Sequence, residues 1–279
     1  MKNQIKLLFV LFIALLMGVN ACTKDNGTQS EQLPTHELGA LLLPESEYAA
    51  IPIAPITDEM KMRALPTSIN LVTPPVKNQG GEGSCVSWGV GYAGRSITWH
   101  QQYGGTYADN LNIFSPEFIY NQIKASADCN SGSYVTRGLD LIQSKGVCLW
   151  ATMPYTDVNC STMPNSDQLA EAANYKISSY ARVNLTVNDI KTQLAAGKAV
   201  VVAGPVNKAY MYLGNNVVLN NFKRPSLGGH CYCVVGYDDA KNAFKFQNSW
   251  GTNWGSQGFG WINYNYITSW WQEAYVMNN

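Results

Sequence analysis

Apolar residues recur at helical spacing in the first half of the chain and form short strand-like runs in the second half. Helices are predicted at residues 85–99, 115–124 and 136–145. Strands are predicted at residues 199–203, 230–237, 243–247 and 260–264. The pattern therefore predicts an α+β protein, with a helical lobe up to about residue 155, a β-rich lobe after it and a cleft between the lobes.

The first 21 residues have the pattern of a targeting signal. Lys2 and Lys6 precede an apolar run at residues 7–17, which is short for a membrane-spanning helix of about 20 residues. The run is followed by Ala21-Cys22, and a small residue directly before a cysteine in that place resembles a bacterial lipobox. We therefore expect lipidation of Cys22 and an extracytoplasmic protein anchored to the bacterial membrane or cell surface. The alternative is ordinary secretion after cleavage near Ala21.

The segment after this signal has no strong pattern of its own. Residues 22–35 are polar and predict a flexible tether. Residues 36–64 hold apolar clusters broken by prolines, which favours a short presegment lying on a surface over an independent domain. From residue 65 to residue 279 the chain is dense with apolar runs and turn signals, and we expect this part to be the folded domain.

The amino-acid composition limits the classes of function that the protein can have. The chain is 46% hydrophobic and 14% charged, which excludes a disordered polymer. Lysine plus arginine equals aspartate plus glutamate at 19 each, so the formal net charge of +0 offers no electrostatic basis for nucleic-acid binding.

A glycine-rich turn at residues 79–85 delivers Cys85 to the start of a predicted helix. Unpaired backbone N–H groups and the helix dipole favour a thiolate over a thiol at such a place. A lone cysteine is weak evidence, because free cysteines are commonly buried and inert. Gln79, six positions upstream, strengthens the case because its amide can donate to an oxyanion beside the Cys85 N–H.

Two further segments carry residues that suit a cysteine nucleophile. His230 follows two glycines and opens an apolar strand, whereas His36 lies in the presegment and His100 near the far end of the nucleophile helix. Asn248 can accept the imidazole N–H and select the tautomer that activates a thiol, and the indole of Trp250 can shield that hydrogen bond from water. Each feature alone also suits ordinary packing, so their combination carries the argument.

Together, Gln-Gly-x-x-Gly-Ser-Cys at 79–85, the histidine at 230 and Asn-Ser-Trp-Gly-Thr-x-Trp-Gly at 248–255 resemble the motifs of the papain family of cysteine peptidases. The resemblance covers about residue 65 to the C-terminus. It implies a two-lobed papain-like fold with a barrel-like C-terminal lobe. It also implies catalytic roles for four residues: Cys85 as nucleophile, His230 as proton acceptor and donor, Asn248 as its orienter and Gln79 in the oxyanion hole.

The resemblance implies substrate contacts and also shows departures. The stretch ending at Gly132 is similar to a Cys-Asn-Gly-Gly stretch that lines the family's cleft, so Gly132, with Trp250, is an expected substrate-binding residue. Glu82 stands where family members often have a cysteine, and Val86 replaces the common tryptophan after the nucleophile. The presegment is shorter than the family's usual inhibitory propeptide.

The other cysteines do not indicate a metal site. Cys129, Cys148 and Cys160 allow three alternative single disulfides, of which we favour one to Cys160 because export indicates an oxidising compartment. Cys231 and Cys233 lie two apart on one predicted strand and are expected to be small buried apolar residues. Paired metal-ligand spacings are lacking in the sequence, so neither a metal nor another cofactor is expected.

These features predict an exported cysteine endopeptidase, made as a zymogen, that hydrolyses protein or peptide substrates and is a target for protein inhibitors. The bond after Arg63 is a candidate site for removal of the presegment. An amidase or transpeptidase with the same triad is one alternative, and a non-enzymatic surface-binding module is another. Cleavage preference, physiological substrate and oligomeric state are not predicted.

Overall fold

The computed structural model describes residues 36–279, which all belong to one compact unit. The predicted targeting signal, Cys22 and the tether up to residue 35 lie outside the described residues. Within residues 36–279, none of the helices combines the length and the apolar character that crossing a membrane requires.

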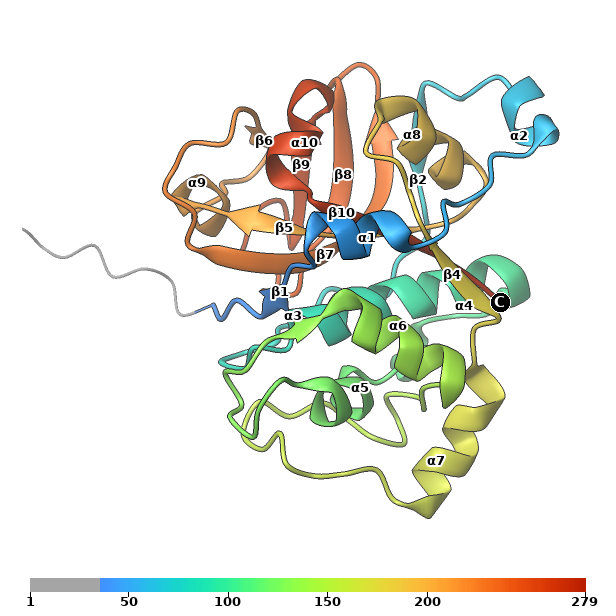
Figure 1. Ribbon diagram of the computed structural model, residues 1–279, viewed down its shortest axis with the longest axis vertical. Helices are drawn as coiled ribbons and strands as arrows, with labels where there is room; N and C mark the ends of the chain where they lie inside the picture. The colour runs from blue at the N-terminus through green and yellow to red at the C-terminus, as the bar shows by residue number, and fades with distance from the viewer. Residues whose placement is uncertain (1–35) are drawn as a thin grey trace, which may run out of the picture. The chain divides into compact units, whose positions relative to one another are not determined.

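Helices and strands are interspersed along the chain (Figure 1). The α-helices of the described residues are α1 (Glu45–Ala50), α2 (Asp58–Met62), α3 (Cys85–Ser87), α4 (Ser96–Tyr103), α5 (Pro116–Ile123), α6 (Val135–Ser144), α7 (Ser166–Ala172), α8 (Val187–Ala195), α9 (Lys208–Met211) and α10 (Ile267–Trp270). The strands are β1 (Ala40–Leu41), β2 (Ser68–Asn70), β3 (Ser133–Tyr134), β4 (Ser179–Arg182), β5 (Val200–Val206), β6 (Val218–Leu219), β7 (Gly228–Asp238), β8 (Ala243–Gln247), β9 (Phe259–Asn263) and β10 (Glu273–Asn278).

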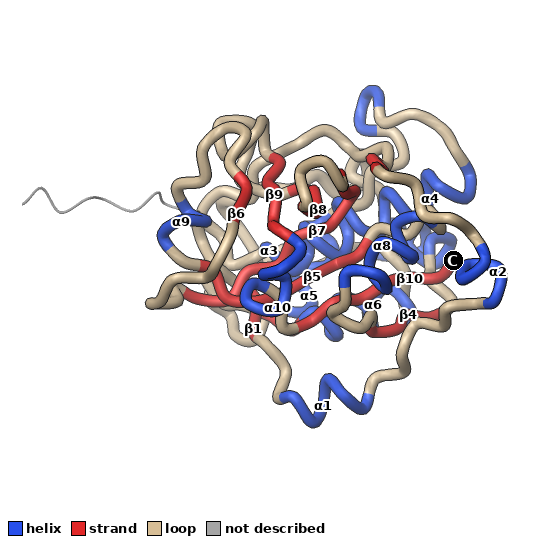
Figure 2. The backbone as a smooth tube through the Cα atoms, turned by 90° about the horizontal axis from the view of Figure 1, so that it is seen from above, coloured by secondary structure: helices blue, strands red, loops and turns tan. Residues whose placement is uncertain are grey.

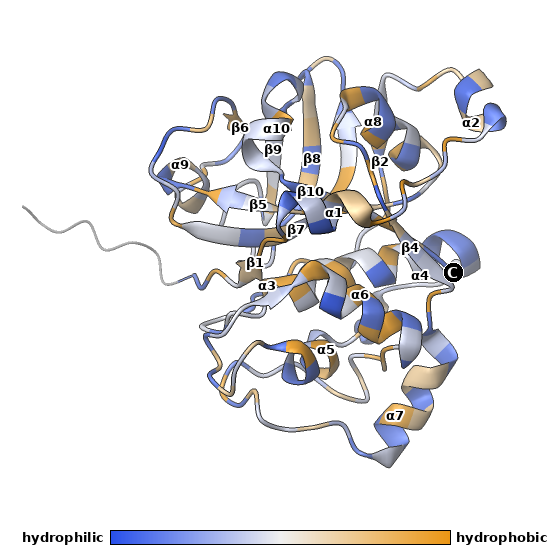
Figure 3. Cartoon of the chain, in the orientation of Figure 1, coloured by the Kyte–Doolittle hydropathy of each residue, from blue (hydrophilic) through white to orange (hydrophobic). Residues whose placement is uncertain are grey.

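The three predicted helices are confirmed and form most of the helical lobe. α3 and α4 are joined by a π-helical segment, η1 (Trp88–Arg95), so the nucleophile helix runs without a break from Cys85 to Tyr103. The α5 helix begins where Ser115 accepts a hydrogen bond from the Phe118 N–H and Pro116 takes the first turn. Figure 3 shows apolar and polar colours on different parts of α6, as expected from its helical periodicity.

α7 lies in the helical lobe in Figure 1, so that lobe continues beyond the predicted end near residue 155. The chain then crosses into the β-rich lobe through β4. The sequence periodicity up to residue 155 predicted the earlier helices of this lobe but not α7, which comes later in the chain.

The β-rich lobe is built on one sheet with the strand order β4-β10-β5-β7-β8-β9-β6, and β2 pairs with β7 off this path. The four predicted strands are confirmed as β5, β7, β8 and β9. Figure 2 shows β5, β7 and β10 running side by side, with α1 beyond them. The expected barrel-like closure is wrong, because β4 and β6 end the sheet of the described residues without pairing with each other.

Residues 36–64 run along both lobes. β1 pairs in parallel with β3 of the helical lobe, with Ala40 opposite Ser133. The Tyr48 hydroxyl oxygen of α1 lies 3.2 Å from two backbone carbonyl oxygens on the sheet side, those of Val183 and Ala274. Ile53 then bridges to Arg182 at the edge strand β4. A domain boundary at residue 64 stays a prediction.

Candidate active site

Cys85 is the first residue of α3 and is fully buried. Burial raises the pKa of its thiol to about 11, and backbone N–H groups, including those of Cys231 and Gly39, act in the opposite direction. Cys231 directly follows His230 on β7, so the thiol lies against the strand that carries the histidine. The start of the nucleophile helix and the presegment residue Gly39 therefore meet at this sulfur atom.

His230 and Asn248 come from neighbouring strands of the sheet. His230 lies on β7 and Asn248 directly follows β8, and these two strands are paired antiparallel. The imidazole Nε2 lies 2.7 Å from the Asn248 Oδ1, and both residues are buried. An amide oxygen can only accept, so Nε2 carries the hydrogen and Nδ1 is left as the basic nitrogen. The Nδ1 atom has no hydrogen-bond partner among residues 36–279.

The protonation of His230 follows from its surroundings. Burial lowers the pKa of the imidazole to about 3; the hydrogen bond to Asn248 opposes this shift, and His36 adds to it. With the thiol pKa raised at the same time, the described state holds a neutral thiol and a neutral imidazole. Exposure of these two groups to water lowers the pKa of the thiol and raises that of the imidazole, which favours a thiolate–imidazolium pair.

Gln79 is held from two sides. Its Oε1 accepts a hydrogen bond from the Ser249 hydroxyl at 2.7 Å. Its Nε2 donates to the Glu82 carbonyl at 2.8 Å and to the carbonyl of the presegment residue Glu37 at 3.1 Å. The amide predicted to stabilise an oxyanion therefore already contacts a backbone carbonyl oxygen. Ser249 was not singled out from the sequence, because its role depends on a contact across 170 positions.

Trp250 lies between two imidazole rings. It is tilted against His230 with the ring centroids 4.4 Å apart, and it stacks on His36 at 4.7 Å with the rings 5° from parallel. The indole thus covers the catalytic candidate His230. The presegment covers the indole in turn, and only 2% of Trp250 is exposed.

Gly132 lies directly beneath the presegment. A Cβ atom on Gly132 would come within 2.5 Å of the Gly39 carbonyl oxygen, which accepts a hydrogen bond from the Ser133 N–H at 2.8 Å. The absence of a side chain at residue 132 thus lets an extended backbone approach the helical lobe. This is the kind of contact expected of a substrate-binding glycine, here made by the chain's own residues.

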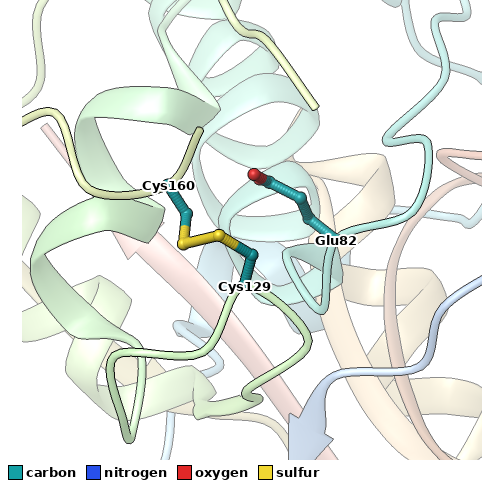
Figure 4. A group of neighbouring side chains, drawn as sticks. All are labelled: Glu82, Cys129 and Cys160. Carbon is teal, nitrogen blue, oxygen red and sulfur yellow. A yellow bond between two sulfur atoms is a disulfide. The ribbon is translucent and has the colours of Figure 1, made fainter. Parts of the chain in front are cut away.

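The departures from the family pattern have structural counterparts. Val86 is buried, and Trp88 packs in an aromatic cluster with Tyr92, Trp150 and Tyr155. A disulfide to Cys160 is present, as favoured, and its partner, which the sequence left open, is Cys129; Glu82 is buried beside it (Figure 4).

The remaining cysteines of the described residues, Cys148, Cys231 and Cys233, are free and buried. Cys231 and Cys233 thus match the expectation of small buried residues.

Comparisons with known proteins identify the family of the chain. A family model described as papain family cysteine protease matches residues 58–276. An uncharacterised peptidase C1-like protein of Acanthamoeba polyphaga mimivirus is 27% identical over 229 residues, covering 76% of this chain and 70% of the viral protein. Peptidase 1 of Dermatophagoides farinae is 25% identical over 246 residues, covering 83% of this chain and 68% of that protein.

Among solved structures, xylellain, a cysteine protease from Xylella fastidiosa, is similar with a TM-score of 0.73 and 25% identity, covering 89% of this chain and 98% of xylellain. The digestive procathepsin L2 proteinase of Tenebrio molitor has the same fold, with a TM-score of 0.72, 20% identity and coverage of 88% of this chain and 79% of that protein. The family model matches well over half of the chain, and the fold agrees with it. The chain therefore belongs to the papain family of cysteine proteases.

Proposed function

We propose that this cysteine protease is an exported endopeptidase, made as a latent precursor, in which Cys85, His230, Asn248 and Gln79 perform acyl transfer on protein or peptide substrates. The observation that carries the proposal is the buried 2.7 Å contact between His230 and Asn248, which leaves the Nδ1 of His230 unpartnered among the described residues. That nitrogen is the base that a cysteine nucleophile requires.

In the proposed reaction, Nδ1 of His230 takes the proton of the Cys85 thiol, and the thiolate attacks the carbonyl carbon of the scissile bond. The resulting oxyanion accepts hydrogen bonds from the Gln79 amide and the Cys85 backbone N–H. His230 then donates its proton to the leaving amine, and a thioester remains on Cys85. A water molecule, deprotonated by His230, hydrolyses the thioester and restores the thiol.

The same residues support latency. The presegment contacts each part of the machinery: the Glu37 carbonyl at Gln79, the Gly39 backbone at the Cys85 thiol, and the His36 ring on Trp250. A substrate has to occupy these positions, so the presegment and a substrate exclude each other. We propose that cleavage after the exposed Arg63 releases the segment.

The first experiment measures hydrolysis of a mixed peptide library under mild reduction. It compares the full chain, a chain that begins at Ala64, and Cys85→Ala in both forms. We expect activity in the shorter form that Cys85→Ala abolishes. Activity in the full chain would support the peptidase function but contradict the proposed latency. If no form cleaves peptides while Cys85 still reacts with an alkylating agent, the peptidase proposal is wrong and amide substrates outside proteins become the next choice.

The lipid anchor on Cys22 is a separate proposal, supported by the lipobox-like sequence. We expect the mature protein to partition into detergent and Cys22→Ser to remain in the aqueous phase. Equal partitioning of the two proteins would favour simple secretion. N-terminal sequencing of the processed protein tests the Arg63 site, and a start far from residue 64 would reject that site.

A further inference from the structure

Glu82 is a buried acid in the middle of the loop that carries Gln79 and Cys85. Its side chain is 1% exposed, and its Oε1 atom has no hydrogen-bond partner among residues 36–279. Figure 4 shows the carboxyl group beside the Cys129–Cys160 disulfide, and the ligand atoms of the three residues lie within 4.8 Å of one another. The two sulfur atoms are bonded to each other, so this group is not a set of metal ligands.

The other carboxyl oxygen contacts a tyrosine that holds the same loop. The hydroxyl oxygen of Tyr155 lies 3.0 Å from Glu82 Oε2, 2.7 Å from the Gln79 carbonyl oxygen and 2.7 Å from the Ser84 hydroxyl. Tyr155 thereby contacts the backbone of the oxyanion residue and the side chain of the residue before the nucleophile. These contacts position both ends of the loop at residues 79–85.

The number of hydrogens available at these contacts favours a protonated Glu82. The tyrosine hydroxyl has one hydrogen to donate, and the Gln79 carbonyl can only accept. If Glu82 were ionised, its Oε2 would also only accept, so one of the two contacts would bring bare oxygen atoms together inside the protein. If Oε2 carries a proton, Glu82 donates to Tyr155, Tyr155 donates to Gln79, and the Ser84 hydroxyl donates to Tyr155. All three contacts are then hydrogen bonds.

We propose that Glu82 is a positioning residue that acts as a neutral carboxylic acid: through Tyr155 its proton holds Gln79 and Ser84 in the geometry of the oxyanion hole. Loss of this proton breaks the relay and loosens the loop. The inference rests on the proposed function of Gln79 and goes beyond it, because it makes turnover depend on the protonation of a residue that does not touch substrate.

The surroundings place this titration near neutral pH. Burial raises the pKa of Glu82 to about 7; the negative charges of Glu117 and Asp157 add to this shift, and Lys124 opposes it. The Tyr155 hydroxyl also lowers the pKa, because in the ionised state it turns from the Gln79 carbonyl and donates to the Glu82 carboxylate. Tyr120 of α5 is a further titratable group that interacts with the Glu82 carboxyl group. Glu117 lies on α5, and Lys124 is the residue at its C-terminal cap. Asp157 lies two positions after Tyr155 in the sequence.

The decisive variant is Glu82→Gln, whose amide N–H donates to Tyr155 at every pH. For the full chain after activation, we expect the wild-type kcat to fall about tenfold as the pH rises from about 6 to about 9, less than the roughly 10²–10³-fold effect of deleting an oxyanion donor. The KM should change less, because the oxyanion contact forms mainly in the transition state. Glu82→Gln should lack this loss.

Glu117→Gln is the matched control. It removes a second buried carboxyl group of the same lobe, whose oxygens accept hydrogen bonds from the Thr156 N–H and the Asn121 amide. The control should keep the alkaline loss, with its midpoint moved to lower pH because the charge of Glu117 no longer raises the pKa of Glu82. An alkaline loss of the same size and midpoint in Glu82→Gln and in the wild type would overturn the proposal.

Infrared spectroscopy of the full chain provides a readout that does not need activity. The wild-type spectrum minus the Glu82→Gln spectrum should contain the carbonyl stretch of a protonated carboxyl group at pH about 6, and this band should disappear with a midpoint near 7. Absence of the band at pH about 6 would overturn the proposal. If Glu82→Gln does not fold, Tyr155→Phe replaces it: the band should shift to the frequency of a carboxyl group that donates no hydrogen bond. An inactive wild type would reject the proposed function, while the infrared titration would still decide the protonation of Glu82.

Discussion

Gly39→Ala is the substitution that tests most directly whether the presegment keeps the enzyme latent. A Cβ atom at residue 39 would lie 1.9 Å from the Gly83 carbonyl oxygen and 2.4 Å from its carbon. Both are backbone atoms of the loop that ends at Cys85, and they cannot move away as a flexible side chain could. Residue 39 therefore has to withdraw from the cleft, whereas the folded domain after residue 64 keeps its sequence.

The size of the effect follows from the contacts that residue 39 makes. Its carbonyl accepts the hydrogen bond from the Ser133 N–H, which contributes about 1 kcal/mol. Forcing a methyl group into a packed site costs about 1–3 kcal/mol. The sum of about 2–4 kcal/mol corresponds to a shift of about 30- to 900-fold from the covered toward the uncovered state.

The assay measures the rate at which iodoacetamide modifies Cys85 in the full chain, with the modified peptide identified by mass spectrometry. We expect the Gly39→Ala chain to react faster than the wild type by up to this factor. Gly81→Ala is the control, because a Cβ atom at Gly81 meets nothing within 4 Å. If Gly39→Ala reacts as slowly as the wild type while the Ala64 form reacts quickly, the contact of Gly39 with the loop does not maintain the latency.

In the activated enzyme, Gln79→Ala should lower kcat by about 10²–10³-fold with little change in KM, measured by steady-state kinetics; an equal rise in KM would assign Gln79 to ground-state binding. Burial and the neighbouring His36 lower the pKa of His230 to about 3, and removing the presegment takes away part of this effect. The uncovered state therefore binds the proton at higher pH, so the covered state should lose stability as the pH falls toward 3. Backbone amides of residues 36–42 should therefore be less protected from hydrogen exchange at pH about 4 than at pH about 7, after correction for the pH dependence of exchange in unstructured peptides. Equal protection at both pH values would contradict this. Replacing Cys129 and Cys160 by serine removes a disulfide between residues 31 positions apart. This should lower the free energy of unfolding, measured by urea titration, by about 3–4 kcal/mol. A loss under about 1 kcal/mol would show that the unfolded chain is compact in this region.

The local elements of this fold are predictable because they depend on neighbours in the sequence. The helices around Cys85, Ser115 and residue 136 appear where periodicity and capping predict them. The strands β5, β7, β8 and β9 appear where β-branched and aromatic runs predict them. The closure of the β-rich lobe was predicted wrongly, since local patterns do not state how the ends of a sheet pair.

The sequence alone supplies the residues of the proposed chemistry: a cysteine at a helix start, a glutamine before it, and a histidine and an asparagine on later segments. The tertiary structure alone decided which of these groups meet and what covers them. The Ser249–Gln79 and Glu82–Tyr155 contacts join residues 170 and 73 positions apart, and His36 reaches Trp250 from a segment without a motif. Residue types and spacings specify local geometry and reactivity, whereas such contacts depend on strand register and on how the two lobes and the presegment pack together.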